Sequence, residues 1–219
     1  AMSDLHLKCI ESWKKFCPDY EIVRWDEKNY DFSKYRYMQE AYKAKKWGYV
    51  PDLARLDIIY EYGGIYLDTD VELIRSLDEV LINEAFCGFE ACPLINIGGG
   101  FGGRRKYPLF KKMIDLRKDM NFVFADGSYN LAPNTYFETP FFRNNGVYLD
   151  GTLQLIDGMK LYPAEYFHPK NIMTGTVNMT EKTFGIHHFG WSWADSNQQK
   201  ERNLTNQEYL RVLNRMEKI

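Results

Sequence analysis

Hydrophobic and polar residues alternate along the chain with two periods, one typical of helices and the other of strands. Longer segments repeat apolar residues at helical spacing, whereas short apolar runs lie between turn residues. The pattern predicts helices at 5–16, 34–47, 51–62, 76–81, 108–120, 135–145 and 204–216, and strands at 21–25, 65–67, 86–89 and 96–101. Short strands and turns are expected over 146–168, and a strand that runs into a loop over 183–193. This alternation predicts an α/β fold with a mixed, mostly parallel central sheet flanked by helices.

The segment 51–62 is the clearest of the predicted helices. Pro51 suits a first helical turn, and Gly63 suits a C-terminal cap. Asp52 and Arg55 are three positions apart, so they share one face of this helix. The pair is either a surface ion pair, which stabilises a helix only slightly, or a pair of groups that face a ligand.

Composition and charge narrow the classes of protein. With 219 residues, of which 45% are hydrophobic and 16% aromatic, the chain can bury one sizeable core. A formal charge of −2 and a pI near 6.1 provide no basic surface, so no nucleic-acid partner is expected. No apolar run reaches the roughly 18 to 20 residues of a transmembrane segment. The four cysteines form no CxxC pair, which favours reduced thiols and a cytoplasmic location, with association at the inner membrane face left open.

Two carboxylates directly follow a predicted strand in "GGIYLDTDVELI", residues 63–74. Side chains at i and i+2 of an extended segment point the same way, so Asp68 and Asp70 can converge on one point. Two acids held close together repel once water is removed, and a divalent cation both neutralises them and prefers their oxygens. Ligands of α/β sheets bind at the carboxyl ends of strands, where these acids lie. The pattern predicts a cation site, although two solvated turn acids would give the same tripeptide.

The run "YVPDLARLDIIYEYGGIYLDTDVELIRSLD", residues 49–78, resembles the DXD sugar-binding region of the family 32 glycosyltransferases. That family includes capsular polysaccharide synthesis enzymes and yeast-type mannosyltransferases, and it is similar, more distantly, to the glucosylating toxins. The segments "CIESWKKFCPDYEIVRWDEKNYD", "FGGRRKYPLFKKM" and "GIHHFGWSW" extend the likeness over most of the chain. The resemblance implies a GT-A fold, a nucleotide-sugar donor, a Mn²⁺ or Mg²⁺ ion, and transfer with retention of the anomeric configuration.

The resemblance also implies roles for individual acids and for the arginine. Asp70 would bind the ion directly, and Asp68 would contact the ion or the ribose and sugar of the donor. Asp52 and Arg55 stand at the spacing of an Asp and an Arg that contact the donor in the glucosylating toxins. We therefore expect Asp52 to bind the donor, and Arg55, Asp68 and Asp70 to form the catalytic set.

A third metal ligand is expected from the histidine pair near the end of the chain. Successive residues of a strand face opposite sides, so only one of His187 and His188 can face the ion. We favour His188, with Ser192 and Trp193 lining the phosphates by resemblance to related enzymes, whereas a core histidine satisfied by the backbone is the alternative. Asn96 lies in the glycine-dense "INIGGGFGG" and is expected to donate to the sugar, which the glycines let the backbone approach.

These expectations combine into one function with two alternatives. We expect a metal-dependent, retaining hexosyltransferase that uses a UDP-sugar and an oligosaccharide or glycan acceptor in surface polysaccharide synthesis. Residues 1–219 would form one GT-A-like catalytic domain, in which the usual N-terminal first strand of the family is absent. A metal-dependent phosphohydrolase would show more carboxylates and histidines in several motifs. A noncatalytic carbohydrate-binding domain would need aromatic residues but no nucleotide.

Overall fold

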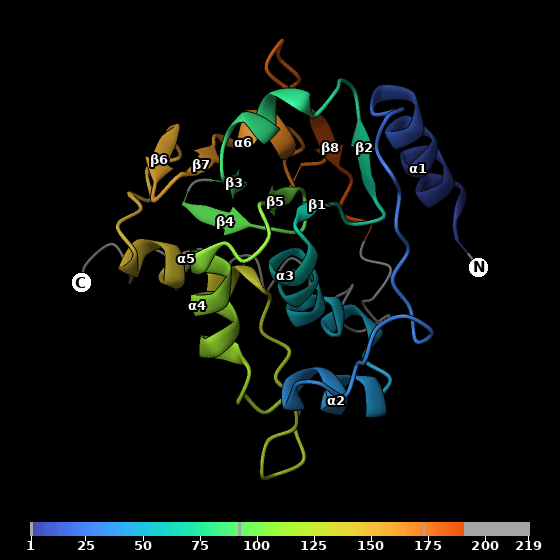
Figure 1. Cartoon of the computed structure of the whole chain (residues 1–219), viewed down its shortest axis with the longest axis vertical. Coiled ribbons are helices and arrows are strands. Elements are labelled where there is room, and N and C mark those ends of the chain that lie inside the picture. The colour runs from blue at the N-terminus through green and yellow to red at the C-terminus, as the bar shows by residue number, and fades with distance from the viewer. Residues whose placement is uncertain (1, 92, 173, 191–219) are drawn as a thin grey trace.

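The computed structural model describes residues 2–91, 93–172 and 174–190, and it arranges them in layers of helix and sheet (Figure 1). Its helices are α1 (Asp4–Phe16), α2 (Arg36–Lys43), α3 (Pro51–Tyr62), α4 (Pro108–Arg117), α5 (Thr135–Asn144) and α6 (Ala164–Phe167), with the 3₁₀ turns η1 (Trp47–Tyr49) and η2 (Asp78–Ile82). Its strands are β1 (Gly64–Tyr66), β2 (Val71–Leu73), β3 (Ala85–Ala91), β4 (Leu94–Asn96), β5 (Phe101–Gly103), β6 (Gln154–Ile156), β7 (Met159–Tyr162) and β8 (Gly185–His187).

The main sheet is mixed, with the strand order β1-β5-β3-β7-β6 and with β4 paired to β3. The predicted α/β fold with a mixed sheet is confirmed, but the prediction of a mostly parallel sheet is wrong. Only β3 and β7 run parallel among the described strands, and every other pair is antiparallel. The reason is the length of the connections. β6 and β7 are joined by Asp157 and Gly158, both with positive φ, and such a tight turn produces an antiparallel hairpin, whereas the long β3–β7 connection carries helices.

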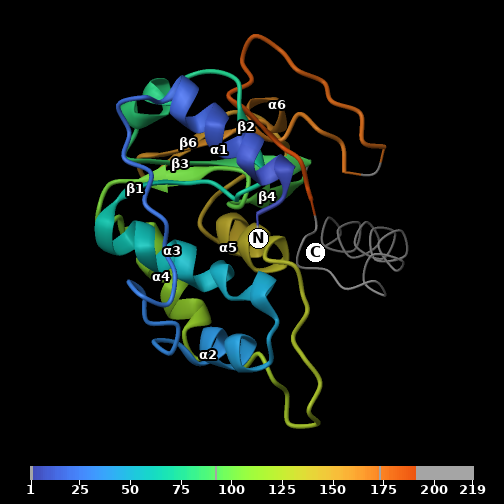
Figure 2. The ribbon, with the colours of Figure 1, turned by 90° about the vertical axis from the view of Figure 1, so that its right-hand side faces the viewer.

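Helices cover both faces of this sheet, as the view from the side shows (Figure 2). α3, α4 and α5 cover one face and bury a core with β3. η2 and α6 cover the other face together with the separate β2–β8 ladder. The two cores explain why residues 85–89 of β3, which lies between them, are buried.

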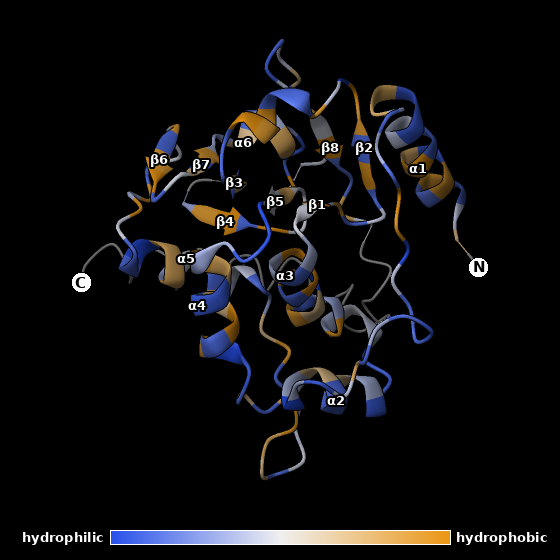
Figure 3. Cartoon of the chain, in the orientation of Figure 1, coloured by the Kyte–Doolittle hydropathy of each residue, from blue (hydrophilic) through white to orange (hydrophobic). Residues whose placement is uncertain are grey.

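The small β2–β8 ladder is held in place by α1, whose predicted extent agrees with the structure. The backbone N–H of Leu73 donates to Ser12 Oγ at 2.8 Å, and Trp13 Nε1 donates to the Val71 carbonyl at 2.6 Å. β2 pairs with β8 along one edge, and these two bonds pair backbone N–H and C=O groups on its other edge. In Figure 3, β2 is largely hydrophobic, whereas α1 mixes both kinds of residue, as expected for a strand packed beneath an amphipathic helix.

Several predicted elements differ from the structure. The segment 21–25 forms no strand, since it pairs with no described strand and leaves Ile22 and Val23 exposed. The predicted strand at 96–101 is divided into β4 and β5 by the glycines at 98–100, and 76–81 forms a 3₁₀ turn rather than an α-helix. The predicted helix at 204–216 lies outside the described residues.

Candidate active site

The two acids of the DXD sequence come together through a turn rather than along an extended strand. The Val71 N–H donates to the Asp68 carbonyl at 3.0 Å, which closes a tight turn around Asp70. The Asp68 N–H in turn donates to the carbonyl of Gly98 at 3.0 Å, so the loop after β4 supports the turn. The sequence argument placed both acids beside one point, and the structure does so by a different local geometry.

The β2–β8 ladder brings His187 to the same point. Its register pairs Val71 with His187, so the imidazole lies next to the turn that contains both acids. His187 Nε2 is 3.4 Å from Asp70 Oδ1 and 3.9 Å from Asp68 Oδ2. Atoms from the three side chains lie within 4.8 Å of one another. Asp68, Asp70 and His187 are therefore close enough to share one ion.

The charges of this cluster support one another. Burial opposes ionisation of Asp70, but its hydrogen bond with His187 and the N–H of Gly190 hold the pKa of Asp70 below its usual range. Burial also opposes a charged imidazole, but the hydrogen bond and charge of Asp70, with Asp68, raise the pKa of His187 above its usual value. His187 thus stands where a cation is electrostatically favourable.

The structure differs from the sequence-based choice of His188. Its Nε2 is 2.9 Å from Glu72 Oε2, and the same carboxylate oxygen accepts from Lys8 Nζ at 2.8 Å. The cause is the alternation of side chains across the strand, which turns His188 away from the acids once the register places His187 beside them. The sequence established that only one imidazole could face the acids, but the register selects which one.

Arg55 and Asp52 are buried rather than on the surface, with exposed fractions of 5% and 6%. Arg55 NH2 donates to Asp52 Oδ1 at 3.2 Å, and its NH1 lies 3.4 Å from Asp68 Oδ1. Tyr66 OH also donates to Asp68 Oδ1, at 2.7 Å. The expected reach of Arg55 into the cleft of the acids therefore agrees with the structure, and the alternative of a surface ion pair does not.

The charge on Arg55 is secured by its neighbours. Burial alone would lower the pKa of Arg55, but Asp68, Tyr66 and Asp52 raise it, so the guanidinium stays charged. On the other side of Asp52, Arg117 NH1 donates to the Asp52 carbonyl at 3.4 Å. A buried arginine held by two acids keeps a fixed orientation, which a flexible surface arginine would not.

Glycines form the opposite wall of the cleft. A Cβ placed on Gly98 would lie 2.3 Å from Asp68 Oδ2 and 2.9 Å from both Arg55 NH1 and Asn96 Oδ1. Only glycine lets the backbone pack this closely against the three groups. Asn96 is buried and donates from Nδ2 to Glu90 Oε2 at 2.6 Å, so Asn96 borders the site but already has a protein partner.

Sequence reasoning did not find four polar residues that surround the site, which are Tyr66, Glu90, Glu138 and His168. Tyr66 precedes Asp68 by two positions, and this spacing was the only local signal. The other three are polar residues at the ends of β3, in α5 and after α6, and only the fold brings them close. Glu138 accepts from the Ile97 N–H at 3.1 Å and so fixes the loop before the glycines. Ser192 and Trp193 lie outside the described residues.

The donor set suits a hard or borderline divalent cation. Two carboxylates and one imidazole are the ligands that Mn²⁺ accepts, and the carboxylates alone suit Mg²⁺. His187 Nε2 is directed toward both acids, so the three ligand atoms lie close enough to surround one ion. The residues present therefore fit the ion that the sequence predicts.

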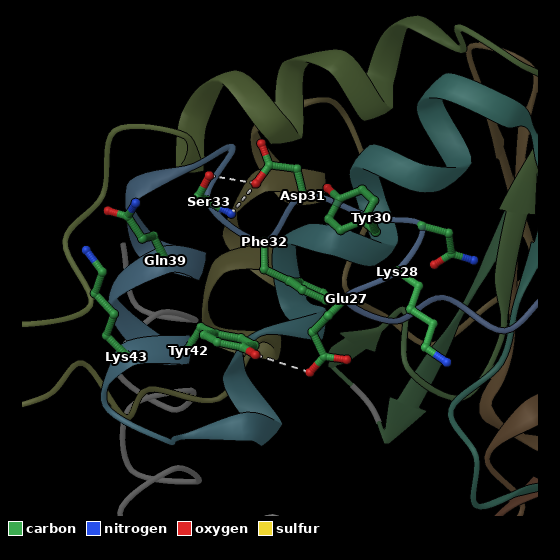
Figure 4. Close-up of a pocket in the computed structure, with 10 residues that line it drawn as sticks. Glu27, Lys28, Tyr30, Asp31, Phe32, Ser33, Gln39, Tyr42 and Lys43 are labelled. Carbon is green, nitrogen blue, oxygen red and sulfur yellow. Dashed lines mark hydrogen bonds between the residues drawn. The ribbon is translucent and has the colours of Figure 1, made fainter.

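An open pocket lies on the other side of α3, away from the acids (Figure 4). The rings of Phe32 and Tyr42 stack there with centroids 5.7 Å apart, and Tyr42 OH donates to Glu27. Tyr30 also lines the pocket, and its hydroxyl donates to Asp57 on α3. On the helix, Asp57 faces away from Arg55, so this pocket does not include the candidate site.

Comparison with known proteins points to one kind of enzyme. Residues 3–87 match the family model described as a glycosyltransferase sugar-binding region containing a DXD motif. A stretch of 68 residues is 41% identical to part of inositol phosphoceramide mannosyltransferase 3 of Schizosaccharomyces pombe. The matched stretch covers 29% of this chain and 19% of that protein. No solved structure matches the chain. The matched region of the family model includes Asp52, Arg55, Asp68 and Asp70, whereas His187 lies beyond it.

None of the helices in the described part of the chain is long and apolar enough to cross a membrane.

Proposed function

We propose that the chain transfers a hexose from a nucleotide-sugar donor to a saccharide acceptor with the help of Mn²⁺ or Mg²⁺. The reason is that it is a glycosyltransferase family 32-like protein. The observation that carries this proposal is the convergence of Asp68, Asp70 and His187 beside the buried Arg55. A UDP-sugar is the proposed donor and a glycan the proposed acceptor, in surface polysaccharide synthesis. The single GT-A-like domain over residues 1–219 is part of the same proposal.

The residues divide the work of binding the donor. Asp70 and His187 are proposed ion ligands, and Asp68 is the third, with its second contact to Arg55 setting its orientation. When bound, the divalent ion would act as a Lewis acid that stabilises the departing diphosphate. Arg55 has its charge fixed and its guanidinium next to Asp68, so it can add a second positive group near the phosphates. Asp52 orients Arg55 through their 3.2 Å contact.

Donor recognition is proposed for the glycine wall. Gly98 lets the backbone lie close to Asp68, Arg55 and Asn96, so a donor sugar bound by these three side chains would also lie near the backbone. Asn96 would exchange part of its contact with Glu90 for a sugar hydroxyl. Ser192 and Trp193 keep their proposed place beside the phosphates. Retention of the anomeric configuration needs no enzymic nucleophile if the leaving phosphate assists the acceptor on the same face of the sugar.

The decisive experiment is a panel of nucleotide sugars incubated with the protein. We expect one donor, tested among UDP-hexoses and GDP-mannose, to be hydrolysed or transferred only when Mn²⁺ or Mg²⁺ is present, and EDTA to stop the reaction. The mannosyltransferase relative is the reason for including a mannose donor. Proton NMR of the product gives its anomeric configuration, and an inverted product contradicts only the stereochemical part.

The same samples distinguish the alternatives. Turnover of a simple phosphoester without use of any nucleotide sugar would favour a phosphohydrolase. Calorimetric binding of a saccharide with no effect of UDP or Mn²⁺ would favour a carbohydrate-binding domain. Activity that is unchanged in EDTA would contradict the metal-dependent mechanism.

A further inference from the structure

Two buried imidazole nitrogens near the acids have no hydrogen-bond partner among the described residues. They are Nδ1 of His187 and Nε2 of His168, whose residues are exposed by only 6% and 3%. A buried polar atom that stays unpaired costs about 1 to 3 kcal/mol, so each such atom calls for an explanation. The two rings are neighbours, with centroids 5.5 Å apart and planes tilted by 55°.

The surroundings of His168 decide which of its nitrogens carries the proton. His168 Nδ1 lies 3.0 Å from the carbonyl oxygen of Phe89, which can only accept, so Nδ1 holds the hydrogen. Nε2 of His168 has no partner among the described residues, so in the neutral ring it is a bare acceptor inside the protein.

The fold holds this acceptor in place. The His168 N–H donates to the Ala164 carbonyl at 2.7 Å, and the Phe184 N–H donates to the Tyr166 carbonyl at 2.7 Å, which ties α6 to the start of β8. A Cβ on Gly99 would lie 1.9 Å from His168 Nε2, so only glycine makes room for this edge of the ring. His168 is thus positioned by β3, α6 and the glycine loop rather than by a free side-chain rotation.

His187 Nε2 faces the acids, and Nδ1 of the same ring is buried without a partner beside the ring of His168. An imidazole that binds a metal through Nε2 must carry its hydrogen on Nδ1, and such a hydrogen usually has an acceptor that fixes the ring. Two imidazoles joined by an N–H···N bond of ~2.9 Å have centroids about 5 Å apart. At the observed 5.5 Å the two rings form no hydrogen bond, so a small movement of His187 toward His168 would form it when the ion is bound.

We propose that His168 is a positioning residue that accepts a hydrogen bond from Nδ1–H of His187 and thereby presents His187 Nε2 to the divalent ion. The inference rests on the proposed function, since it assigns His187 to the ion. In this arrangement, hydrogen bonds link the Phe89 carbonyl, His168 and His187, and they set the tautomer of His187. His168 itself does not contact the ion or the donor. No transfer of a proton along the chain is required.

The test compares Mn²⁺ affinity, measured by calorimetry on the whole protein, in four forms. Wild type should bind Mn²⁺, and His168→Phe, which keeps the ring but removes both nitrogens, should bind it about 10- to 100-fold more weakly. His168→Gln, which offers an amide oxygen to His187 and an amide N–H to the Phe89 carbonyl, should bind more tightly than His168→Phe. The matched control is Phe122→Leu, which loosens the separate core beneath α2 and should keep wild-type affinity.

A second readout follows the tautomer itself. Long-range ¹H–¹⁵N NMR with Mg²⁺ should show His187 protonated on Nδ1 in wild type, with His187→Gln identifying its signals, and a mixture of tautomers in His168→Phe. Equal Mn²⁺ affinity in wild type and His168→Phe, no tighter binding by His168→Gln than by His168→Phe, or an unchanged tautomer in folded His168→Phe overturns the role of His168. A wild type that binds no Mn²⁺ overturns the proposed metal site instead, so the two failures are distinguishable.

Discussion

Acidic side chains lie on two opposite sides of helix α3, and their environments differ. On one side Asp57 accepts from Tyr30 OH at 2.7 Å, from Tyr35 OH at 2.7 Å and from Lys34 Nζ at 2.7 Å and 2.8 Å. Its two oxygens are saturated by donors of the protein. On the other side Arg55 reaches the DXD turn, where Asp68 and Asp70 face each other with one imidazole between them.

The difference separates an acid that holds the fold from acids that bind a ligand. A carboxylate with a full set of protein donors gains charge-assisted hydrogen bonds and has no capacity left for a ligand. Paired carboxylates with few protein donors repel each other and keep oxygen lone pairs for a cation. Burial differs in the same sense, because Asp57 is fully buried whereas Asp68 and Asp70 are only half-buried.

Removing one charge from the paired acids should have the largest effect on function. Asp70→Asn keeps the size of the side chain but weakens ion binding, so transfer or donor hydrolysis should fall at least about 100-fold, roughly 3 kcal/mol of transition-state stabilisation. Steady-state kinetics with Mn²⁺ measure it. The variant should also unfold at a somewhat lower denaturant concentration, because the charged Asp70 side chain is stabilised in the fold by His187 and by the N–H of Gly190. An unimpaired Asp70→Asn enzyme would contradict the proposed role of the pair.

The opposite result is expected for the saturated acid. Asp57→Asn leaves Lys34 without its charged partner and one tyrosine hydroxyl without an acceptor, so the free energy of unfolding should fall by about 2 kcal/mol. Urea unfolding followed by circular dichroism measures it. Mn²⁺ affinity of the folded variant should equal that of wild type. A large loss of Mn²⁺ affinity would show that the two sides of α3 are coupled.

Adding a methyl group to the glycine wall tests whether donor binding depends on the position of the Asp68 carboxylate. A methyl group on Gly98 would approach Asp68 Oδ2 to 2.3 Å, so Gly98→Ala should displace that carboxylate and weaken donor binding about tenfold, or ~1.4 kcal/mol. Titration with the nucleotide sugar measures it. The control is Gly127→Ala, which adds a methyl group at an exposed turn where nothing lies near the Cβ position. If Gly98→Ala and Gly127→Ala bind the donor with equal affinity, the proposed role of this side of the site is contradicted.

A third kind of buried acid gives an effect on stability that depends on pH. Burial raises the pKa of Glu138 to about 8, above its ordinary value of 4.5. The folded state therefore holds a proton that the unfolded state loses between these values, so stability should fall as pH rises from about 5 to about 8, by at most about 1.4 kcal/mol per pH unit. Glu138→Gln should remove that part of the slope. Parallel slopes in urea unfolding of the two proteins would show that Glu138 is ionised throughout.

Local patterns predicted much of the secondary structure because the interactions that form it lie close in sequence. The helix at 51–62 was predicted with its observed bounds, since Pro51 and Gly63 mark its ends and helical hydrogen bonds need no distant partner. Strands were less certain. The segment 21–25 has strand composition but pairs with no described strand, and strand formation depends on that partner.

The sequence by itself determined the type of chemistry: two acids one residue apart after an apolar strand, an Asp and an Arg on one helical face, and a distant histidine pair. Only the tertiary structure decided how they meet. The register of β2 with β8 selected His187 over His188, and the turn at Asp68 replaced the expected extended geometry. His168 and Glu138 joined the site through packing of α6 and α5. Residue types fix which ligands can be bound, but the positions of groups far apart in sequence depend on pairing and packing across the whole fold, which no local pattern encodes.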